Sequence, residues 1–110
     1  KSDVQKMAKD PIIFALANPE PEIWPEDAIA AGAKVVATGR ADYPNQVNNV
    51  VAFPGIFAGA LENNISKISR DMYVKAAYNL ANLISEPIPE KIIPSVFDDG
   101  VVESVKQAMN

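Results

Sequence analysis

Residues 12–39 read IIFALANPEPEIWPEDAIAAGAKVVATG, and this stretch decides the fold. It begins with a continuous apolar run at residues 12–17 and closes with a second apolar run at residues 34–38. Continuous rather than alternating apolar runs are typical of parallel strands that are covered on both faces. Between the two runs, Pro25 suits the first turn of a short helix, and Gly32 suits its end. The order strand, helix, strand predicts a βαβ unit and therefore a parallel sheet.

Helices are predicted on both sides of this unit. Ser2 and Gln5 have the spacing of a capping box at the start of a short helix over residues 3–9. Residues 50–61 are apolar and predict a second helix, with Pro54 either in its first turn or at a kink. This segment is rich in glycine and alanine, so we expect it to pack closely against another backbone.

Residues 69–84 predict the strongest helix of the chain. Apolar side chains recur there at the spacing i, i+3, i+4, i+7, which indicates one buried face. The members of this face are Tyr73, Ala76, Ala77, Leu80, Leu83 and Ile84. Asp98 or Asp99 is expected to cap a last helix that ends near Ala108.

The composition excludes several classes of function. The chain has 110 residues, a net charge of −4, and neither Cys nor His. It therefore has no thiolate metal site, and it lacks the commonest metal ligand and general base at neutral pH. The basic residues are scattered, so nucleic acid is not expected as a partner. No apolar run approaches about 20 residues, so no membrane span is expected, and we predict an acidic cytoplasmic protein.

Polar residues follow both predicted strands at their carboxyl ends. Asn18 follows the first strand, and Thr38 and Gly39 close the second. Four carboxamide residues come soon after the second strand: Asn45, Gln46, Asn48 and Asn49. Ligands of open α/β sheets bind beyond the carboxyl ends of the strands. The sequence therefore predicts a polar binding rim at which Asn18 and Asn49 converge on one ligand.

Each of these positions also has a purely structural interpretation. Asn18 precedes a proline, and such an Asn often bonds its own backbone in a turn. The carboxamides are also consistent with turns and helix caps, and Arg40 with Asp42 is consistent with a solvated ion pair. Neither a G-x-G-x-x-G nor a Walker sequence is present. The residues by themselves predict part of a parallel α/β domain with a polar rim, and no particular ligand.

Five segments in order carry a resemblance to one family. They are IIFALANP (12–19), Glu22-Ile23 with Pro25-Glu26, VVATGRADYPNQVNN (35–49), FPGIFAGAL (53–61), and Ile92-Ile93-Pro94 with Phe97-Asp98. Together they resemble the C-terminal part of malic enzyme, most of all its short bacterial and archaeal form. The resemblance implies that residues 1–110 are the C-terminal portion of an NAD(P)-binding domain. It implies an α/β fold, with a partial Rossmann-like parallel sheet and trailing helices from about residue 69.

The same resemblance implies an oxidoreductase. Malic enzymes oxidatively decarboxylate L-malate to pyruvate and CO2 while reducing NAD or NADP, with a divalent Mg or Mn. By resemblance, Asn18 and Asn49 contact both substrate and cofactor, and Asn48 contacts the cofactor. Thr38 and Gly39 would line the cofactor cleft through their backbone. No catalytic or metal-binding residue is implied here, because the family's acid/base pair, metal ligands and Gly-rich fingerprint lie upstream of the matched region.

The implied partners are L-malate or pyruvate, the remainder of the chain's own domain, and further copies in a homodimer or higher homo-oligomer. We expect these 110 residues alone to be inactive toward malate. Two alternatives stay open: a malolactic-type enzyme that gives lactate, and a non-catalytic nucleotide-binding remnant or interaction module. Arg40 is disfavoured as a ligand of the NADP 2′-phosphate, because it lies at the nicotinamide-side rim.

Overall fold

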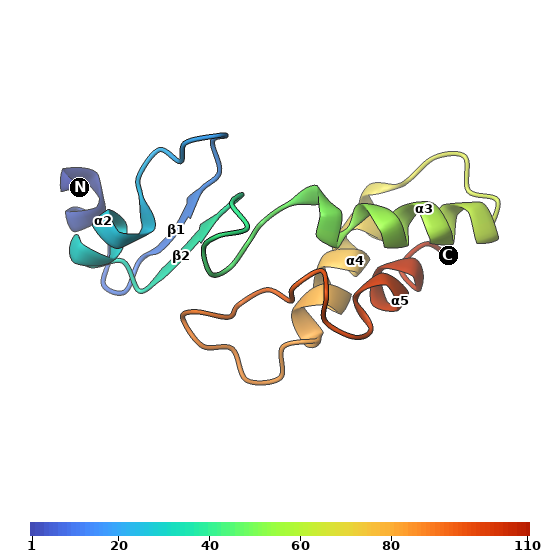
Figure 1. Ribbon diagram of the computed structural model, residues 1–110. Coiled ribbons are helices and arrows are strands. Elements are labelled where there is room, and N and C mark those ends of the chain that lie inside the picture. Colours follow the sequence, from blue (N-terminus) through green and yellow to red (C-terminus); the bar gives the residue numbers. More distant parts are fainter. The chain divides into compact units, whose positions relative to one another are not determined.

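The computed structural model describes residues 1–110, which divide into two compact units. Unit 1 contains residues 1–47 and 87–92, and unit 2 contains residues 48–86 and 93–110. The strands belong to unit 1, and the regular structure of unit 2 is helical (Figure 1).

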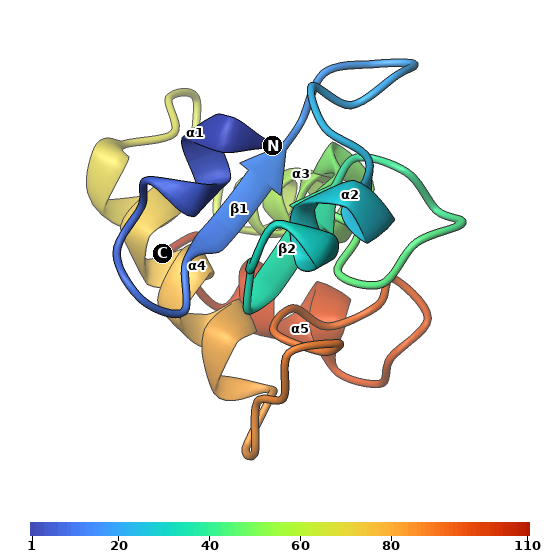
Figure 2. The ribbon, with the colours of Figure 1, turned by 90° about the vertical axis from the view of Figure 1, so that its left-hand side faces the viewer.

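Unit 1 is built around a βαβ element (Figure 2). Strand β1 (Ile12–Ala15) pairs in parallel with strand β2 (Val35–Thr38), in a register that aligns their first residues and their last residues. The connecting helix α2 (Pro25–Ala30) begins with proline, as predicted. It ends ahead of Gly32, whose φ of +108° lies in the region that favours glycine. The predicted parallel sheet is confirmed.

The two strands differ in burial. All four residues of β2 are buried, as predicted for a strand covered on both faces. In β1 only Ala15 is buried, whereas Ile12 and Phe14 are 59% and 52% exposed. Strand side chains alternate between faces, and Ile13 packs on a small core beside α2 that Ile12 and Phe14 do not join. That core consists of Val4, Ala28, Ala33 and Val36. The prediction that both faces of β1 are covered is therefore wrong for the described residues.

Helix α1 (Ser2–Gln5) is shorter than predicted. Lys1 is its N-cap and makes no side-chain bond there, so the capping box of Ser2 and Gln5 is wrong. At its end, the N–H of Lys6 donates to the carbonyl of Asp3, three rather than four residues back, which tightens the last turn.

Unit 2 contains helices α3 (Phe53–Glu62), α4 (Arg70–Asn82) and α5 (Val101–Lys106), with a short 3₁₀ helix, η1 (Asn49–Val51), ahead of α3. Pro54 lies in the first turn of α3, so the alternative of a kink is wrong. The buried core of this unit consists of Val51, Ile56, Ala76, Leu80, Val101, Val105, Ala108 and Met109. None of the helices is long and apolar enough to cross a membrane.

Helix α4 follows its prediction with a narrower buried face. Ser69 caps it by accepting a hydrogen bond from the N–H of Met72 at 3.2 Å. Ala76 and Leu80 of the predicted face are buried. Its exposed members are Tyr73, Ala77 and Leu83. The outer part of the predicted stripe is therefore not covered within the chain.

Helix α5 begins differently from the prediction. Its N-cap is Gly100 with φ +83°, and no side chain caps it. The carboxylate of Asp98 instead accepts a hydrogen bond from the N–H of Ser95 at 3.0 Å, so the proposed capping by Asp98 or Asp99 is wrong. The chain therefore enters α5 through a glycine in the left-handed conformation, at the position where an aspartate cap was expected.

The glycines of α3 bring it close to the backbone of α5. A Cβ on Gly55 would lie 2.7 Å from the carbonyl oxygen of Val102, and one on Gly59 would lie 2.7 Å from that of Lys106. Any side chain at either position would overlap the neighbouring helix. The predicted close packing against another backbone is confirmed.

Candidate functional site

The carboxyl ends of β1 and β2 form a rim at one end of the sheet in unit 1. Thr38, the last residue of β2, is buried, and its Oγ1 accepts a hydrogen bond from the N–H of Arg40 at 3.1 Å. Beside it, a Cβ on Gly39 would lie 3.1 Å from Oδ1 of Asn18, which follows β1. The structure therefore brings together three of the predicted site residues, Asn18, Thr38 and Gly39.

Asn18 is exposed, and its carboxamide makes no hydrogen bond within the chain. The alternative in which this side chain bonds its own backbone in a turn is therefore wrong. The backbone on either side of it is nevertheless fixed. The N–H of Ala17 donates to Oε2 of Glu22 at 3.2 Å, and the carbonyl of Pro19 accepts from Nη1 of Arg40 at 3.0 Å. The rim thus holds an uncommitted carboxamide on an anchored loop.

Arg40 is fixed by its neighbours. Its Nε and Nη2 donate to Oδ1 and Oδ2 of Asp42, both at 2.8 Å, which is the bidentate arrangement of a strong ion pair. Its guanidinium carbon lies 5.3 Å from the centroid of the Trp24 ring. The hydrogen bonds between Arg40 and Asp42 raise the pKa of Arg40 and lower the pKa of the Asp42 carboxyl. The expected ion pair is confirmed, and its bond to Pro19 adds a backbone anchor that the sequence did not indicate.

Tyr43 connects the same loop to helix α2. Its hydroxyl donates to Oε2 of Glu26 at 3.1 Å, and its ring centroid lies 6.2 Å from that of Trp24. Partial desolvation, followed by the neighbouring Glu26 carboxylate, raises the pKa of Tyr43. The phenol is therefore held in its neutral, donating form. Nothing in the sequence singled out this pair, because its members are 17 residues apart.

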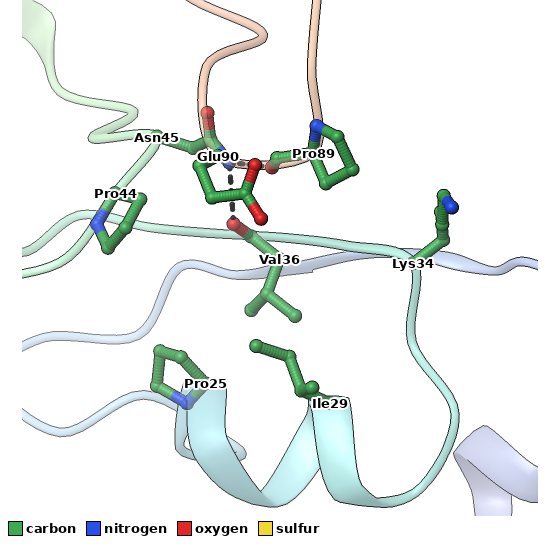
Figure 3. Close-up of a pocket in the computed structure, with 8 residues that line it drawn as sticks. All are labelled: Pro25, Ile29, Lys34, Val36, Pro44, Asn45, Pro89 and Glu90. Atoms are coloured by element: carbon green, nitrogen blue, oxygen red, sulfur yellow. Dashed lines mark hydrogen bonds between the residues drawn. The ribbon is translucent and has the colours of Figure 1, made fainter.

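Asn45 is a structural member of the carboxamide cluster, and sequence reasoning missed its role. It is 7% exposed and has a φ of +57°. Its Nδ2 donates to the carbonyls of Val36 at 3.0 Å and Pro89 at 2.8 Å, and its Oδ1 accepts from the N–H of Ile92 at 2.9 Å. Figure 3 shows its bonds to Val36 and Pro89. One side chain therefore ties residues 87–92 to β2.

The other carboxamides divide between structure and availability. Gln46 makes a long bond from Nε2 to the carbonyl of Gly39 at 3.5 Å. Asn48 caps η1, because its Oδ1 accepts from the N–H of Val50 at 3.0 Å, so the capping interpretation holds for this residue. Asn49 is exposed, and its side chain makes no hydrogen bond within the chain. Asn48 and Asn49 belong to unit 2, and their convergence with Asn18 stays a prediction.

A small cavity of about 60 Å³ lies between α2 and β2 in unit 1 (Figure 3). Its lining residues are Pro25, Ile29, Lys34, Val36, Pro44, Asn45, Pro89 and Glu90. Pockets that hold drug-sized ligands and cofactors span roughly 300–1,000 Å³. The cavity is therefore a packing space beside the Asn45 bonds, and it is not a nucleotide site.

The described residues contain no group of three or more His, Cys, Asp and Glu side chains that could hold a metal ion. At the rim of unit 1, the neutral carboxamide of Asn18 is the exposed polar group without a hydrogen bond in the chain, and it offers both N–H donors and a carbonyl acceptor.

A parallel βαβ element with polar loops beyond its strand ends defines the class: a Rossmann-like α/β nucleotide-binding domain. The family model described as malic enzyme, NAD binding domain, matches residues 2–107. The chain belongs to the malic enzyme family.

Three similar proteins illustrate this membership. The bifunctional malic/malolactic enzyme of Bacillus subtilis is 55% identical over 99% of this chain and 27% of that protein. The NADP-dependent malic enzyme of Rhizobium meliloti is 44% identical over 96% of this chain and 16% of that protein. The crystal structure of the NAD-dependent malic enzyme of Thermotoga maritima superposes with a TM-score of 0.90 and 54% identity, over 96% of this chain and 28% of that one. The chain thus spans about a quarter or less of the length of these relatives.

Proposed function

We propose that this chain forms part of the nucleotide-binding domain of a malic enzyme that converts L-malate to pyruvate and CO2 and reduces NAD or NADP. One observation supports the roles of its residues most directly. Asn18 and Asn49, the two carboxamides that the family resemblance points to, are exposed and make no side-chain hydrogen bond within the chain. By contrast, the side chains of Asn45 and Asn48 hydrogen-bond to backbone groups of the chain itself.

The chemistry of these groups fits the proposed ligands. A carboxamide N–H orients a malate carboxylate without placing a further charge beside the reacting carbon. Asn18 and Asn49 would contact substrate and cofactor in this way, and Asn48 would contact the cofactor through Nδ2, because its Oδ1 caps η1. Thr38 and Gly39 would line the cofactor through their backbone. When bound, the nicotinamide accepts the hydride.

We assign no step to a metal held by these residues, because they contain no suitable cluster of ligands. The family resemblance implies Mg or Mn with ligands outside the matched segment. We accordingly propose that the 110 residues alone do not oxidise malate. Malate-dependent formation of NAD(P)H by the purified 110-residue chain would overturn this part of the proposal.

The principal test is Asn49→Ala in a full-length malic enzyme that contains these residues. Losing a hydrogen bond to a charged substrate group costs about 1.5–3 kcal/mol, so we expect kcat/KM for malate to fall by roughly 10- to 100-fold. Asn82→Ala is the matched control, because Asn82 is an exposed Asn near the end of α4. Unchanged kinetics for Asn49→Ala, with an unchanged circular dichroism spectrum, would remove Asn49 from the site.

A malolactic reaction is the second candidate function. The similarity to a relative named bifunctional malic/malolactic enzyme favours it. Product analysis separates the two reactions, since the malolactic reaction yields lactate without net formation of NADH. Pyruvate formed in equal amount with NAD(P)H supports the first candidate.

We further propose a cytoplasmic homodimer or higher homo-oligomer. Support comes from a row of exposed apolar side chains along α3, where Phe53, Phe57 and Leu61 are 44%, 63% and 79% exposed. Exposed apolar patches often mark interfaces, here either with the rest of the chain's own domain or with another copy. A monomeric mass of the full-length protein, measured by sedimentation at micromolar concentration, would contradict the oligomer.

A further inference from the structure

Gly39 lacks the usual backbone reason to be glycine. Its φ is not positive, unlike those of Gly32 at +108° and Gly100 at +83°. An alanine would therefore meet no conformational barrier at this position. The reason for the missing side chain must be sought in what surrounds the Cα atom.

The space beside Gly39 is occupied by a single group. A Cβ there would lie 3.1 Å from Oδ1, 3.5 Å from Nδ2 and 3.7 Å from Cγ of Asn18, and these are its three nearest neighbours. All three atoms belong to one carboxamide. Glycine at this position therefore leaves room for the Asn18 side chain to lie against the end of β2.

The residue after Gly39 acts on the backbone of the same loop. Nη1 of Arg40 donates to the carbonyl of Pro19 at 3.0 Å, directly after Asn18. The bidentate bond to Asp42 fixes the plane of the guanidinium and thereby aims Nη1. Two consecutive residues at the end of β2 therefore act on this loop: Gly39 leaves the space in which the Asn18 carboxamide lies, and Arg40 bonds the carbonyl of the next residue, Pro19.

We propose that Gly39 and Arg40 are positioning residues for the Asn18 carboxamide: Gly39 leaves its place open, and Arg40 anchors the carbonyl of Pro19, the residue that follows Asn18. This inference rests on the proposed function, in which Asn18 contacts substrate and cofactor. Small displacements of such a group matter, because a misplacement of about 1 Å in a reacting complex can lower the rate roughly 100-fold. A methyl group at 3.1 Å shifts the carboxamide by a few tenths of an ångström while leaving the fold intact.

The test is a double-mutant cycle in the full-length enzyme with Asn18→Ala, Gly39→Ala and the double variant, with kcat and KM measured separately for malate and for the cofactor. We expect Gly39→Ala to lower kcat/KM roughly fivefold or more, in proportion to a shift smaller than 1 Å. In the Asn18→Ala background, we expect Gly39→Ala to have no further effect, because the group that it displaces is gone.

Gly32→Ala is the control for a glycine substitution in the same unit. A Cβ there would meet no atom within 4 Å, but the φ of +108° is strained for alanine. It should therefore lower the unfolding temperature and leave the kinetics unchanged.

Arg40→Lys is the second test variant. It keeps the charge but loses the bidentate geometry, so we expect it to lower kcat/KM. Combined with Asn18→Ala, it should likewise have no further effect.

The outcomes distinguish the proposed role of Asn18 from the proposed positioning by Gly39 and Arg40. Wild-type kinetics for Asn18→Ala would refute the proposed role of Asn18 itself. Impaired Asn18→Ala together with wild-type kinetics for Gly39→Ala and Arg40→Lys would refute positioning and leave the role of Asn18 in place. Effects that multiply in the double variants would also refute it, because they would show that Gly39 and Arg40 act independently of Asn18.

Discussion

Unit 2 and unit 1 both contain glycines that touch a neighbour, but the neighbours differ. A Cβ on Gly55 or Gly59 would meet a backbone carbonyl of α5 at 2.7 Å, whereas a Cβ on Gly39 would meet the end of the Asn18 side chain at 3.1 Å. A backbone carbonyl can yield only if its helix moves, while a surface side chain yields by rotating. The same substitution should therefore report on stability in unit 2 and on positioning in unit 1.

The interiors of the two units differ in the same sense. Unit 2 has a contiguous apolar core shared by α3, α4 and α5. Unit 1 has a smaller core, and its loops depend on side-chain bonds to backbone groups, above all those of Asn45. The larger apolar core therefore lies in the helical unit, which also has side-chain bonds to the backbone from Asn63 and Asn79. At the rim of unit 1, the bond from Arg40 to Pro19 holds the loop.

The largest effect of a glycine substitution is expected from Gly59→Ala in unit 2. Its Cβ would lie 2.6 Å from Cβ of Met109 as well as 2.7 Å from the carbonyl of Lys106, so α3 and α5 must separate. Overpacking typically costs 1–3 kcal/mol, and we expect a loss of about 3 kcal/mol in the free energy of unfolding, measured with urea.

Helix propensity alone predicts the opposite sign for this substitution, since alanine in a helix is favoured over glycine by about 0.5–1 kcal/mol. An unchanged or increased stability of Gly59→Ala would therefore contradict the close packing of α3 and α5. Ala60→Gly, one residue along the same helix, is the matched control, and it should lose only about 1 kcal/mol.

In unit 1 the largest loss is expected at Asn45. Removing its carboxamide leaves the buried carbonyl of Val36 and two backbone groups of residues 87–92 without a partner. Asn45→Gly should lose about 2 kcal/mol, because it removes the bonds without straining the backbone. Asn45→Ala should lose about 1 kcal/mol more, since its φ of +57° is unfavourable for alanine. Urea unfolding measures both, and wild-type stability of Asn45→Gly would show that the three bonds contribute nothing.

Sequence patterns predicted the elements that depend on local rules. The apolar runs predicted β1 and β2, and Pro25 predicted the start of α2. The small residues of α3 predicted its close packing against another backbone, which is that of α5. Sequence patterns could not predict the role of Asn45, because its partners Pro89 and Ile92 lie 44 and 47 positions further along the chain. A buried carboxamide and an exposed one look alike in a sequence until their distant partners are known.

The candidate site was predictable to a similar extent. Alternation of strand and helix placed Asn18, Thr38 and Gly39 at one rim, because parallel strands end on the same side. The contact of Gly39 with Asn18 depends on side-chain orientation and was not predicted. The same limit explains the missed cap at Gly100, where the φ of +83° determines how α5 begins.

A smaller effect on stability is expected from Gly39→Ala, in contrast with Gly59→Ala. Its Cβ would press only on an exposed carboxamide, so the free energy of unfolding should stay within about 0.5 kcal/mol of the wild type. Parallel urea titrations of the two variants make the comparison. A loss at Gly39 as large as that at Gly59 would show that the rim glycine is a packing residue like those of α3.

The smallest effects are expected from one surface ion pair in each unit, and their pH dependences should be opposite. Hydrogen bonds from Arg40 lower the pKa of Asp42. This stabilisation is fully present above the ordinary pKa of a free Asp, about 4, and is lost as the pH falls through the lowered folded pKa. The hydrogen bond to Glu62 raises the pKa of Lys106. That stabilisation is fully present below about pH 10.4 and is lost as the pH rises through the raised folded pKa.

Asp42→Asn and Glu62→Gln should therefore flatten opposite ends of the stability profile. The first should weaken the acid-side decrease in unfolding temperature alone, and the second should weaken the alkaline-side decrease alone. The Asp42 and Glu62 side chains are both 58% exposed. The effects of both substitutions on the unfolding temperature should therefore be smaller in high salt, where exposed charges are screened. Thermal unfolding from low to high pH at two ionic strengths measures this. A change at the same end of the profile for both variants would contradict the assignment of the titrating group, a carboxyl in the pair of unit 1 and an ammonium in the pair of unit 2.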